Sequence, residues 1–562
     1  MENFNIREQY LEIKYIDYIM CGIFAYIIKN DKIFNYNLIF NNFMNLSKRG
    51  PDTFSFKYNK NYFLGFHRLS IMDLSNKGNQ PFEFDFNGYK YTCICNGEIY
   101  NSEILKTTIN FNYNFISESD CEILIPLYLK FGDDMVKYLD GVFSFIIIKE
   151  KKDYFEYFIV RDRIGVRPLY IGHDYKNNIL ISSEIKGFKD LIFNNFSSFD
   201  PGNYMKIKID CNNFELTKIK YFELKLKVLE NKDELYFCDK INHILTESVK
   251  IRLVTDRPIC ALLSGGLDSS LVCSIANKEL KSANYKLNTF SIGMKNSTDN
   301  YYAKLVSDYI DSNHTFVNIT VDDAINCIKD VIYTIESYDV TTVRASVGQY
   351  LISKYISENT NYKVVLSGDG SDEVTGGYLE NYFSPNFTEF QNNTLKRITN
   401  IHYFDVLRAD KATSGHGLEL RVPFLDVNFV NLYLSIHPKF KKPIAGQRCE
   451  KYLLRKSFLN NYLPEEVLWR QKEAFSDGIS STENSWHNIL KNVCNEIVSD
   501  NDLKKNNFSI NSPKTKEAYY YRKIFDEFYN KNRFDSIIPE FWMPSWSESE
   551  DPSARNLSIY KL

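Results

Sequence analysis

The sequence lacks any apolar run near the roughly 20 residues that a membrane span requires. Residues 1–19 carry charges of both signs, from Glu2 to Asp17, and contain no apolar core of a secretory signal. The net charge is only −3, and lysine and arginine are scattered along the chain rather than gathered in one stretch. These absences argue against membrane and nucleic-acid partners and favour a cytoplasmic protein.

Cysteine patterns typical of metal sites and disulfide frameworks are missing as well. The 11 cysteines include no Cys-x-x-Cys pair and no neighbouring histidine cluster, so they are predicted to be reduced thiols. Cys93 and Cys95 alternate on one candidate strand, where they would share a face as small core residues. The cysteines therefore offer no zinc site.

One further absence concerns a stretch that is otherwise typical of nucleotide binding. Residues 259–263 are apolar, residues 264–270 read Ser-Gly-Gly-Leu-Asp-Ser-Ser, and an apolar helical pattern follows. Glycines let backbone N–H groups face an anion, and the following helix adds its N-terminal dipole. The Gly-Lys-Ser/Thr ending of the Walker loop is absent, which argues against a kinase or GTPase. The loop is predicted to hold the pyrophosphate part of a nucleotide.

A second loop of similar composition, residues 367–373, reads Ser-Gly-Asp-Gly-Ser-Asp-Glu. Acids such as Asp268 and Asp372 would repel phosphate unless a cation lay between them, so the pair is predicted to bind one Mg²⁺. Between the two loops, Arg344 can pair with a small carboxylate, while Thr341 either contacts that ligand or caps the following helix.

Residues 21–200 have the pattern of an antiparallel β domain. Turn signals separate apolar candidate strands, and the scarcity of helical patterns favours two stacked sheets. A helix is predicted over residues 120–129, with Pro126 either kinking it or delaying its start. The candidate strands are 21–28, 62–67, 91–95, 142–148, 155–161 and 179–183.

After Tyr236 strands and helices alternate, which is typical of a doubly wound parallel sheet whose ligands bind where strand order reverses. The chain is mostly helical from residue 395, and residues 546–562 contain too few apolar side chains to pack firmly. The predicted strands are 259–263, 287–292, 314–319 and 363–366, and the predicted helices are 270–280, 301–311, 322–337 and 345–358.

Several runs in the chain resemble, in order and in spacing, those of the glutamine-hydrolysing asparagine synthetase family. They are LLSGGLDSS at 262–270, FSIG at 290–293, ESYDVTTVRAS at 336–346, SGDGSDEVTGGY at 367–378, ELRVPFLD at 419–426, RQKEAFSDG at 470–478 and SPKTKEAYYYRKIF at 512–525. The resemblance extends from Cys21 to the C-terminus, which makes it far more specific than any one motif.

The resemblance implies two domains of different fold class. The first is an α+β, four-layer αββα sandwich of the N-terminal-nucleophile amidotransferase type. The second is an α/β, doubly wound parallel-sheet synthetase domain with a helical C-terminal part. The implied divisions are an extension at 1–20 absent from the active form, an amidotransferase domain at 21–205, a connection at 206–235, an ATP-binding synthetase domain at 236–545, and a loose tail at 546–562.

For the first domain the resemblance implies the chemistry of a class II glutamine amidotransferase. Cys21 would be the nucleophile with its own α-amine as the base, and the Asn96 side chain and the Gly97 N–H would form the oxyanion hole. Arg68 would hold the glutamine α-carboxylate, and Glu98 and Asp120 the α-ammonium group. The implied glutamine-binding residues are Arg68, Leu69, Ser70, Ile71, Met72, Asn96, Gly97, Glu98 and Asp120.

For the second domain the resemblance implies adenylation of aspartate by ATP, followed by attack of ammonia to give asparagine, AMP and diphosphate. Lys472 would steady phosphate charge, and Asp369 would assist adenylate formation and ammonia transfer. The implied residues are Leu263, Ser264, Gly265, Gly266, Asp268, Ser269, Ile292, Ser367 and Gly368 for ATP, Thr341, Thr342 and Arg344 for aspartate, and Asp268 and Asp372 for Mg²⁺.

Two positions depart from the family pattern. Cys21 lies inside the chain, where its nitrogen is an amide and not a base, so initiation at Met20 with removal of that methionine, or cleavage of a propeptide, is expected. Asp369 stands where the family has glutamate, one methylene longer, and the Asp369→Glu variant is expected to match or exceed the parent rate.

Three alternatives remain open at the level of the sequence. A related amidotransferase acting on another carboxylate, or an ammonia-only synthetase, would share the two nucleotide loops. A catalytically silent nucleotide-binding regulator would be expected to have lost Cys21, Asp268 or Asp372, and all three are present. The oligomeric state is undetermined, with a homodimer as one alternative.

Overall fold

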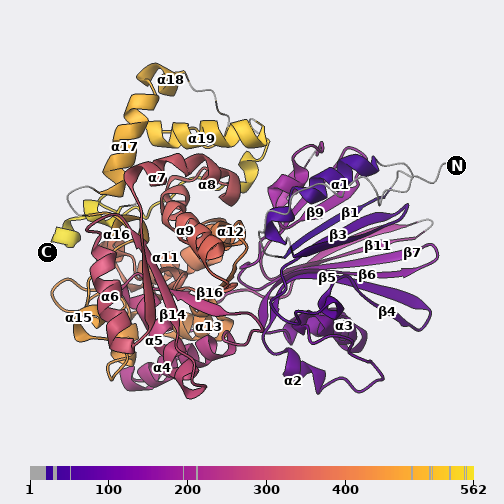
Figure 1. The fold of residues 1–562 in the computed structure, drawn as a ribbon, viewed down its shortest axis with the longest axis horizontal. Helices are drawn as coiled ribbons and strands as arrows, with labels where there is room; N and C mark the ends of the chain where they lie inside the picture. Colours follow the sequence, from indigo (N-terminus) through magenta and orange to yellow (C-terminus); the bar gives the residue numbers. More distant parts are fainter. Residues whose placement is uncertain are drawn as a thin grey trace.

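The computed structural model describes most of the chain in two halves that lie side by side (Figure 1). The described residues are 21–29, 35–50, 52–193, 195–210, 213–481, 485–505, 508, 510–530, 533–549, 551 and 553–561. The extension predicted at 1–20 lies outside them. Among the helices of these residues, none is long and apolar enough to cross a membrane.

The N-terminal half contains two antiparallel sheets of six strands each. The first has the order β10-β8-β9-β1-β3-β2 and the second the order β12-β11-β7-β6-β5-β4. The first sheet consists of β1 Gly22–Ile27, β2 Thr53–Tyr58, β3 Tyr62–Arg68, β8 Tyr170–His173, β9 Ile179–Ser182 and β10 Asn195–Ser198. The second consists of β4 Phe82–Phe86, β5 Tyr89–Ile99, β6 Gly141–Lys151, β7 Tyr154–Arg161, β11 Asn203–Ile209 and β12 Phe214–Lys220.

Alternation of side chains along the strands builds four layers. Ile23 of β1 and Ile146 of β6 point into the core between the sheets, because successive residues of a strand face opposite sides. The neighbouring Phe24 faces outward and packs on Phe43 of α1, Tyr36–Met44. On the outer face of the second sheet, α3 covers Cys93 and Cys95, which share that face as predicted. The predicted αββα sandwich is confirmed.

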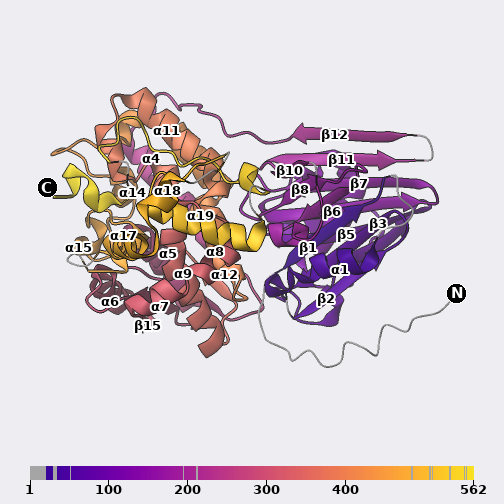
Figure 2. The ribbon, with the colours of Figure 1, turned by 90° about the horizontal axis from the view of Figure 1, so that it is seen from above.

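Two details of this half differ from the expectation or refine it. Residues 203–220 form the β11–β12 hairpin, so the start of the connection predicted at 206 falls inside a strand. The alternating burial of Met205 and Ile207 explains the strand. Figure 2 shows this hairpin at one edge of the half. The helix predicted at 120 begins as a 3₁₀ turn, Asp120–Ile123, and α3, Leu124–Phe131, starts later, with Pro126 in its first turn where no donor is needed.

The second half is built on a parallel sheet with the order β15-β14-β13-β16-β17. The chain enters at the central strand β13, adds β14 and β15 on one side, and then adds β16 and β17 on the other. Strand order therefore reverses between β13 and β16, as the sequence predicted for a doubly wound sheet. The strands are β13 Ile259–Leu262, β14 Asn288–Gly293, β15 Asn313–Asn318, β16 Val364–Leu366 and β17 Glu419–Arg421.

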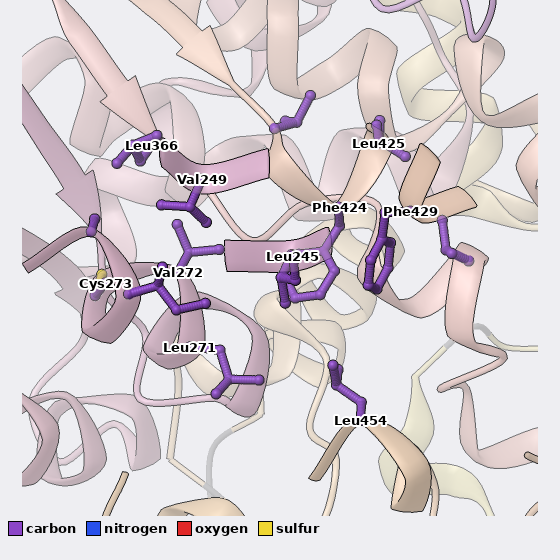
Figure 3. Packing of buried hydrophobic residues seen from close by; sticks show 14 of the residues in the cluster. Leu245, Val249, Leu271, Val272, Cys273, Leu366, Phe424, Leu425, Phe429 and Leu454 are labelled. Atoms are coloured by element: carbon purple, nitrogen blue, oxygen red, sulfur yellow. The ribbon is translucent and has the colours of Figure 1, made fainter. Parts of the chain in front are cut away.

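Helices cover both faces of this sheet. Helices α4 and α5 pack on one face, where Leu245, Val272, Leu366 and Phe424 meet in the core (Figure 3), and α8 and α9 pack on the other. The helices of this half are α4 Glu234–Ile251, α5 Leu267–Ser282, α6 Thr298–Ile310, α7 Val321–Asn326, α8 Ile328–Ile335, α9 Val340–Asn359, α10 Ser371–Thr375, α11 Phe387–Asn400, α12 Asp405–Ser414, α13 Val427–Ser435, α14 Tyr452–Ser457, α15 Glu465–Leu468, α16 Phe475–Gly478, α17 Trp486–Ile497, α18 Asp500–Lys504 and α19 Lys516–Tyr529. In the first half, α2 is Ser102–Lys106.

Two predictions for this half need correction. The helix expected over 322–337 is divided into α7 and α8, and Cys327 is the residue between them. The tail expected to be loose, residues 546–562, contains Leu557 and Ile559, which are 4% and 9% exposed and pack on Leu379. A few apolar anchors are enough to dock the tail because the synthetase half supplies the rest of the apolar surface.

Two candidate active sites

The first candidate site surrounds Cys21 at the start of β1. The Cys21 thiol donates to the Leu69 carbonyl at 3.5 Å, and the Leu69 N–H lies 3.3 Å from the sulfur. The Arg49 Nε donates to the Cys21 carbonyl at 3.0 Å and fixes the backbone there. Burial raises the pKa of the Cys21 thiol to about 12, so the thiol is protonated at neutral pH. A nucleophilic Cys21 needs a base beside it.

Asn96 and Gly97 on β5 present the features of an oxyanion hole in the same cavity. Asn96 is 1% exposed, and its side-chain Nδ2 is buried without a hydrogen-bond partner among the described residues. A Cβ at Gly97 would lie 2.2 Å from the Val142 carbonyl, so only glycine fits against the neighbouring strand. A buried unpaired donor is costly unless it serves a ligand.

Charged groups of both signs line this cavity. The Arg68 guanidinium is held by the carbonyl of Ser75 at 2.8 Å and the Asn79 side chain at 2.7 Å. Asp120 accepts from the Ile99 N–H at 2.6 Å, and burial raises its pKa to about 6. Burial also raises the pKa of Glu98 well above its ordinary value, and the carboxylates of Glu419 and Asp120 add to the shift.

Two residues of the second half contribute charge at this cavity, and the sequence assigned no role to either. Glu419 on β17 lines it, and the Arg421 guanidinium lies 3.3 Å from Glu98 and 2.7 Å from Glu419. Both residues stand in the ELRVPFLD run, which marked the resemblance but gave no hint of contact with the first half.

Most residues predicted to bind glutamine lie together in a small cavity of about 30 Å³. Ser70 is buried next to it but does not line it, and its N–H instead donates to Asp52 at 2.9 Å. The predicted residues that line the cavity are Cys21, Arg68, Leu69, Ile71, Met72, Asn96, Gly97, Glu98 and Asp120.

The second candidate site is a larger cavity of about 210 Å³ at the strand-order reversal. The loops after β13 and β16 meet there: the Ser371 hydroxyl donates to Asp268 at 2.7 Å, and Gly368 lies against the Ser269 backbone. The first loop is closed by Ser264, whose hydroxyl lies 3.0 Å from that of Ser269. The N-terminus of α5 therefore opens into this cavity, which suits a phosphate group.

A lysine that the sequence did not reveal joins the two acids. The Lys451 Nζ lies 2.5 Å from Asp268 and 2.6 Å from Asp372, and the Lys472 Nζ lies 2.6 Å from the second oxygen of Asp372. Although burial raises the pKa of Asp372, the two ammonium groups lower it below its ordinary value. Lys472, which the sequence predicted for the site, lines this cavity, while Lys451 precedes α14 without a recognisable motif.

Asp369 is fixed between α9 and α12. Its carboxylate accepts from Gln349 of α9 at 3.3 Å and from Arg408 of α12 at 3.0 Å, and Ser367 also donates to it. The Arg408 guanidinium in turn donates to the side-chain amide oxygen Oε1 of Gln349 at 2.7 Å. Both carboxylate oxygens of Asp369 therefore accept hydrogen bonds from partners placed to suit an aspartate side chain.

The residues predicted to bind aspartate take different roles. Thr341 and Arg344 line the cavity, and Arg344 is paired with Glu517 and Asp551. Thr342 points away and donates to Asp339 at 2.7 Å, within the N-terminal cap of α9.

Most of the predicted ATP residues also line the larger cavity. Gly265 does not, since its backbone turns toward α6. The predicted residues of the synthetase half that line the cavity are Leu263, Ser264, Gly266, Asp268, Ser269, Ile292, Thr341, Arg344, Ser367, Gly368, Asp369, Asp372 and Lys472.

Known proteins resemble both halves of this chain. The asparagine synthase family matches residues 240–396 and 384–547, and the glutamine amidotransferase domain family matches residues 20–215. Proteins from Bos taurus and Homo sapiens, each called asparagine synthetase (glutamine-hydrolyzing), are 40% identical over 569 and 571 residues. These alignments cover 96% of this chain and 99% of each relative. The relative from Gallus gallus is 39% identical over 575 residues.

Fold, cavities and matches define a two-site protein in which a glutamine amidotransferase half is joined to a synthetase half of the doubly wound type. The chain belongs to the asparagine synthase family, with an N-terminal glutamine amidotransferase domain.

Proposed function

We propose that this chain makes L-asparagine from L-aspartate and ATP, with ammonia from L-glutamine as the nitrogen donor. The observation that carries this proposal is the presence of both cavities in one chain, one around Cys21 and one between the loops of Asp268 and Asp372. The relatives of the same length are called glutamine-hydrolyzing asparagine synthetases, which supports the pairing of the two chemistries.

In the glutamine cavity, the Cys21 sulfur attacks the side-chain amide carbon of glutamine. The α-amine of an N-terminal Cys21 takes the thiol proton and passes it to the departing ammonia. Asn96 and the Gly97 N–H stabilise the charge that develops on the amide oxygen. Water then cleaves the thioester to give glutamate. Arg68 and Asp120 hold the α-carboxylate and the α-ammonium group.

In the synthetase cavity, a side-chain carboxylate oxygen of aspartate attacks the α-phosphorus of ATP, and diphosphate leaves. Lys451 and Lys472 offset the charge on the leaving diphosphate, and Arg344 binds a substrate carboxylate. Ammonia attacks the carbonyl carbon of the aspartyl adenylate, Asp369 takes up a proton, and AMP leaves with the bridging oxygen. The products are asparagine, AMP and diphosphate.

The donor set suits a divalent cation next to the diphosphate. Asp268 and Asp372 face the same cavity, and carboxylate oxygens are the ligands that Mg²⁺ prefers. With Lys451 turned to phosphate, the two carboxylates would hold Mg²⁺, which when bound offsets phosphate charge.

The proposal also covers the domain organisation, the location in the cell and the partners of the chain. The amidotransferase domain is proposed to begin at 21 and the synthetase domain to span 236–545, while the start of the connection moves from 206 to 221, after β12, where the second sheet ends. The free thiols among the described cysteines support action in the cytoplasm. Neither nucleic acid nor a membrane is proposed as a partner. Self-association as a homodimer is also proposed, and light scattering of the purified protein tests it.

The test compares two forms of the protein. The form that begins at Cys21 is expected to produce asparagine from aspartate, ATP and glutamine. In the form with residues 1–20 attached, the rate of glutamine hydrolysis is expected to fall at least about a hundredfold, because Cys21 then lacks the α-amine base. Both forms should use ammonium salts equally, which is the internal control. Mass spectrometry of the native protein should find Cys21 first, and an intact residue 1 in protein that hydrolyses glutamine would contradict this.

The same assay separates the alternatives. Diphosphate release with ammonium but not with glutamine would indicate an ammonia-only synthetase. Release with a carboxylate other than aspartate would indicate a different acceptor.

A further inference from the structure

The end of the chain forms part of the wall of the synthetase cavity. Met543, Asp551, Ser553 and Leu557 all line it. Leu557 is 4% exposed and packs with Leu379. A segment that the sequence predicts to be loose is therefore docked on the site.

This tail contacts the cavity through an arginine predicted to hold the substrate carboxylate. The Arg344 guanidinium donates to Glu517 at 2.8 and 2.7 Å and to Asp551 at 2.9 and 3.0 Å. These bonds use all but one of the N–H donors of Arg344. A third carboxylate cannot make a bidentate contact with the same guanidinium, and it would add a further negative charge next to two others.

The two acids differ in how firmly they are held. Glu517 lies on α19, its side chain is 7% exposed, and it also accepts from the Tyr521 hydroxyl at 3.0 Å. Asp551 lies outside helices and strands, and its side chain is 35% exposed. Since exposed ion pairs are worth less than buried ones with additional bonds, Asp551 is the partner that a substrate can replace.

We propose that Asp551 sets the affinity of the synthetase site for its carboxylate substrate. Its carboxylate pairs with the edge of Arg344 that the substrate carboxylate needs, so substrate binding displaces Asp551 and lifts the tail. This inference rests on the proposed function, because it takes Arg344 to be the substrate-binding arginine.

The tail also reaches the loop that carries Lys472. Arg555 donates to the Glu473 carboxylate at 3.0 Å and to the Asp477 carbonyl at 2.8 Å, and Ser553 donates to the Asp477 carboxylate at 2.9 Å. Displacement of Asp551 therefore loosens the contacts of residues 473–477, next to the lysine that binds Asp372. Occupation of the carboxylate subsite is thereby linked to the diphosphate subsite.

Kinetics of one variant test the proposal. In the diphosphate-release assay with ATP and ammonium, Asp551→Asn is expected to lower KM for aspartate by about three- to tenfold, because the competing charge is removed. The matched control is Glu548→Gln, since Glu548 is an exposed acid of the same tail whose hydrogen bonds, among the described residues, are with Ser558 at 3.0 Å and 2.7 Å. Its KM should equal that of the parent.

Hydrogen exchange gives a second readout that does not depend on the variant. Saturating L-aspartate should raise amide exchange across residues 545–549, 551 and 553–561 of the parent protein. An unchanged or higher KM for Asp551→Asn would overturn the inference, and so would slower amide exchange of the tail in the presence of aspartate. If the parent protein is active in the same assay, the proposed function stands in either case. A parent that releases no diphosphate with aspartate would instead overturn the proposed function.

Discussion

At the scale of single residues, the ammonium group of Lys451 offsets negative charge in the synthetase cavity. It bridges Asp268 and Asp372, two acids that would otherwise repel each other and the phosphates of a nucleotide. Lys451 is buried, and its ammonium group lies inside the cavity rather than at the surface. The residue therefore supplies a buried positive charge to the site.

Removal of this cation should change both stability and pH dependence. In Lys451→Gln, Asp372 keeps only Lys472, so its pKa rises and the acid limb of diphosphate release moves to higher pH. Loss of one partner of a buried pair should also lower stability by about 3–5 kcal/mol. Because the folded pKa of Asp372 is depressed, its stabilising contribution is present above the unfolded pKa and is lost as pH falls through the folded value.

The control for this experiment is Lys456→Gln. Lys456 pairs with Glu234 at 2.5 Å, but both side chains are about one-third exposed, so a change below about 1 kcal/mol is expected. Thermal unfolding and pH–rate profiles of both variants provide the comparison. Equal shifts in the two variants would contradict a special role for Lys451.

Asp369 gives a second prediction at this scale, and it reverses the expectation from the sequence. Gln349, Arg408 and Ser367 hold both carboxylate oxygens at the length of an aspartate. In Asp369→Glu the carboxylate moves by about one ångström, so kcat with aspartate and ammonium should fall by about ten- to a hundredfold. The exposed Asp322→Glu substitution is the control. A rate equal to that of the parent would show that the side chains bonded to Asp369 can rearrange around a glutamate.

Strand β17 is the decisive feature at the scale of secondary-structure elements. It is the last strand of the parallel sheet, yet its Glu419 lines the glutamine cavity of the other half, and its Arg421 pairs with Glu98 of that cavity. The charges of Glu419 and Arg421 act on Glu98 of β5 and on Asp120 of the later 3₁₀ turn. Burial is the main cause that raises the pKa of Asp120, the Glu419 carboxylate raises it further, and the Arg421 guanidinium lowers it. The electrostatics of the glutamine cavity are thus set partly by the synthetase half.

This environment predicts the pH dependence of glutamine use. The pKa of Asp120 is about 6, so as pH falls through that value the carboxyl becomes neutral and loses its attraction for the α-ammonium group. KM for glutamine should therefore rise below pH 6. In Asp120→Asn it should be high at every pH, whereas the exposed Glu118→Gln should behave like the parent.

The fold of the Asp120→Asn variant should survive at neutral pH. Since the folded pKa is raised above the unfolded value, ionisation of Asp120 costs stability as pH rises through about 6. Removal of the charge relieves that cost. A strong loss of thermal stability at pH 7 would mean that the bond from the Ile99 N–H requires a charged acceptor.

At the scale of the whole molecule, buried ion pairs join the two halves. Arg49 donates to Glu184 at 3.1 Å within the first half and pairs with Asp410 of the second at 2.9 Å. Arg49 is also the residue that holds the Cys21 carbonyl. A buried charge left without its partner lowers the free energy of unfolding, so the two halves carry complementary charges where they meet. The backbone of Cys21 is thereby positioned by an arginine that is itself paired with the other half.

The sequence by itself determined the elements and the loops that carry the chemistry. Periodicity located six of the twelve described strands of the first half and four of the five described strands of the second, and glycines with acids marked the two loops at the strand-order reversal, because these patterns are local. The family resemblance added Cys21, Asn96 and Arg68, which composition alone would have left as ordinary residues.

The tertiary structure decided which distant charges meet. Lys451 joins Asp268 across 183 residues, Asp551 reaches Arg344 across 207, and Glu419 enters the cavity of Cys21 from another domain. Such pairings follow from how sheets and tails pack, and no local pattern encodes them. For the same reason burial set the pKa of Cys21 and Asp120, since desolvation is a property of the packed molecule and not of the chain.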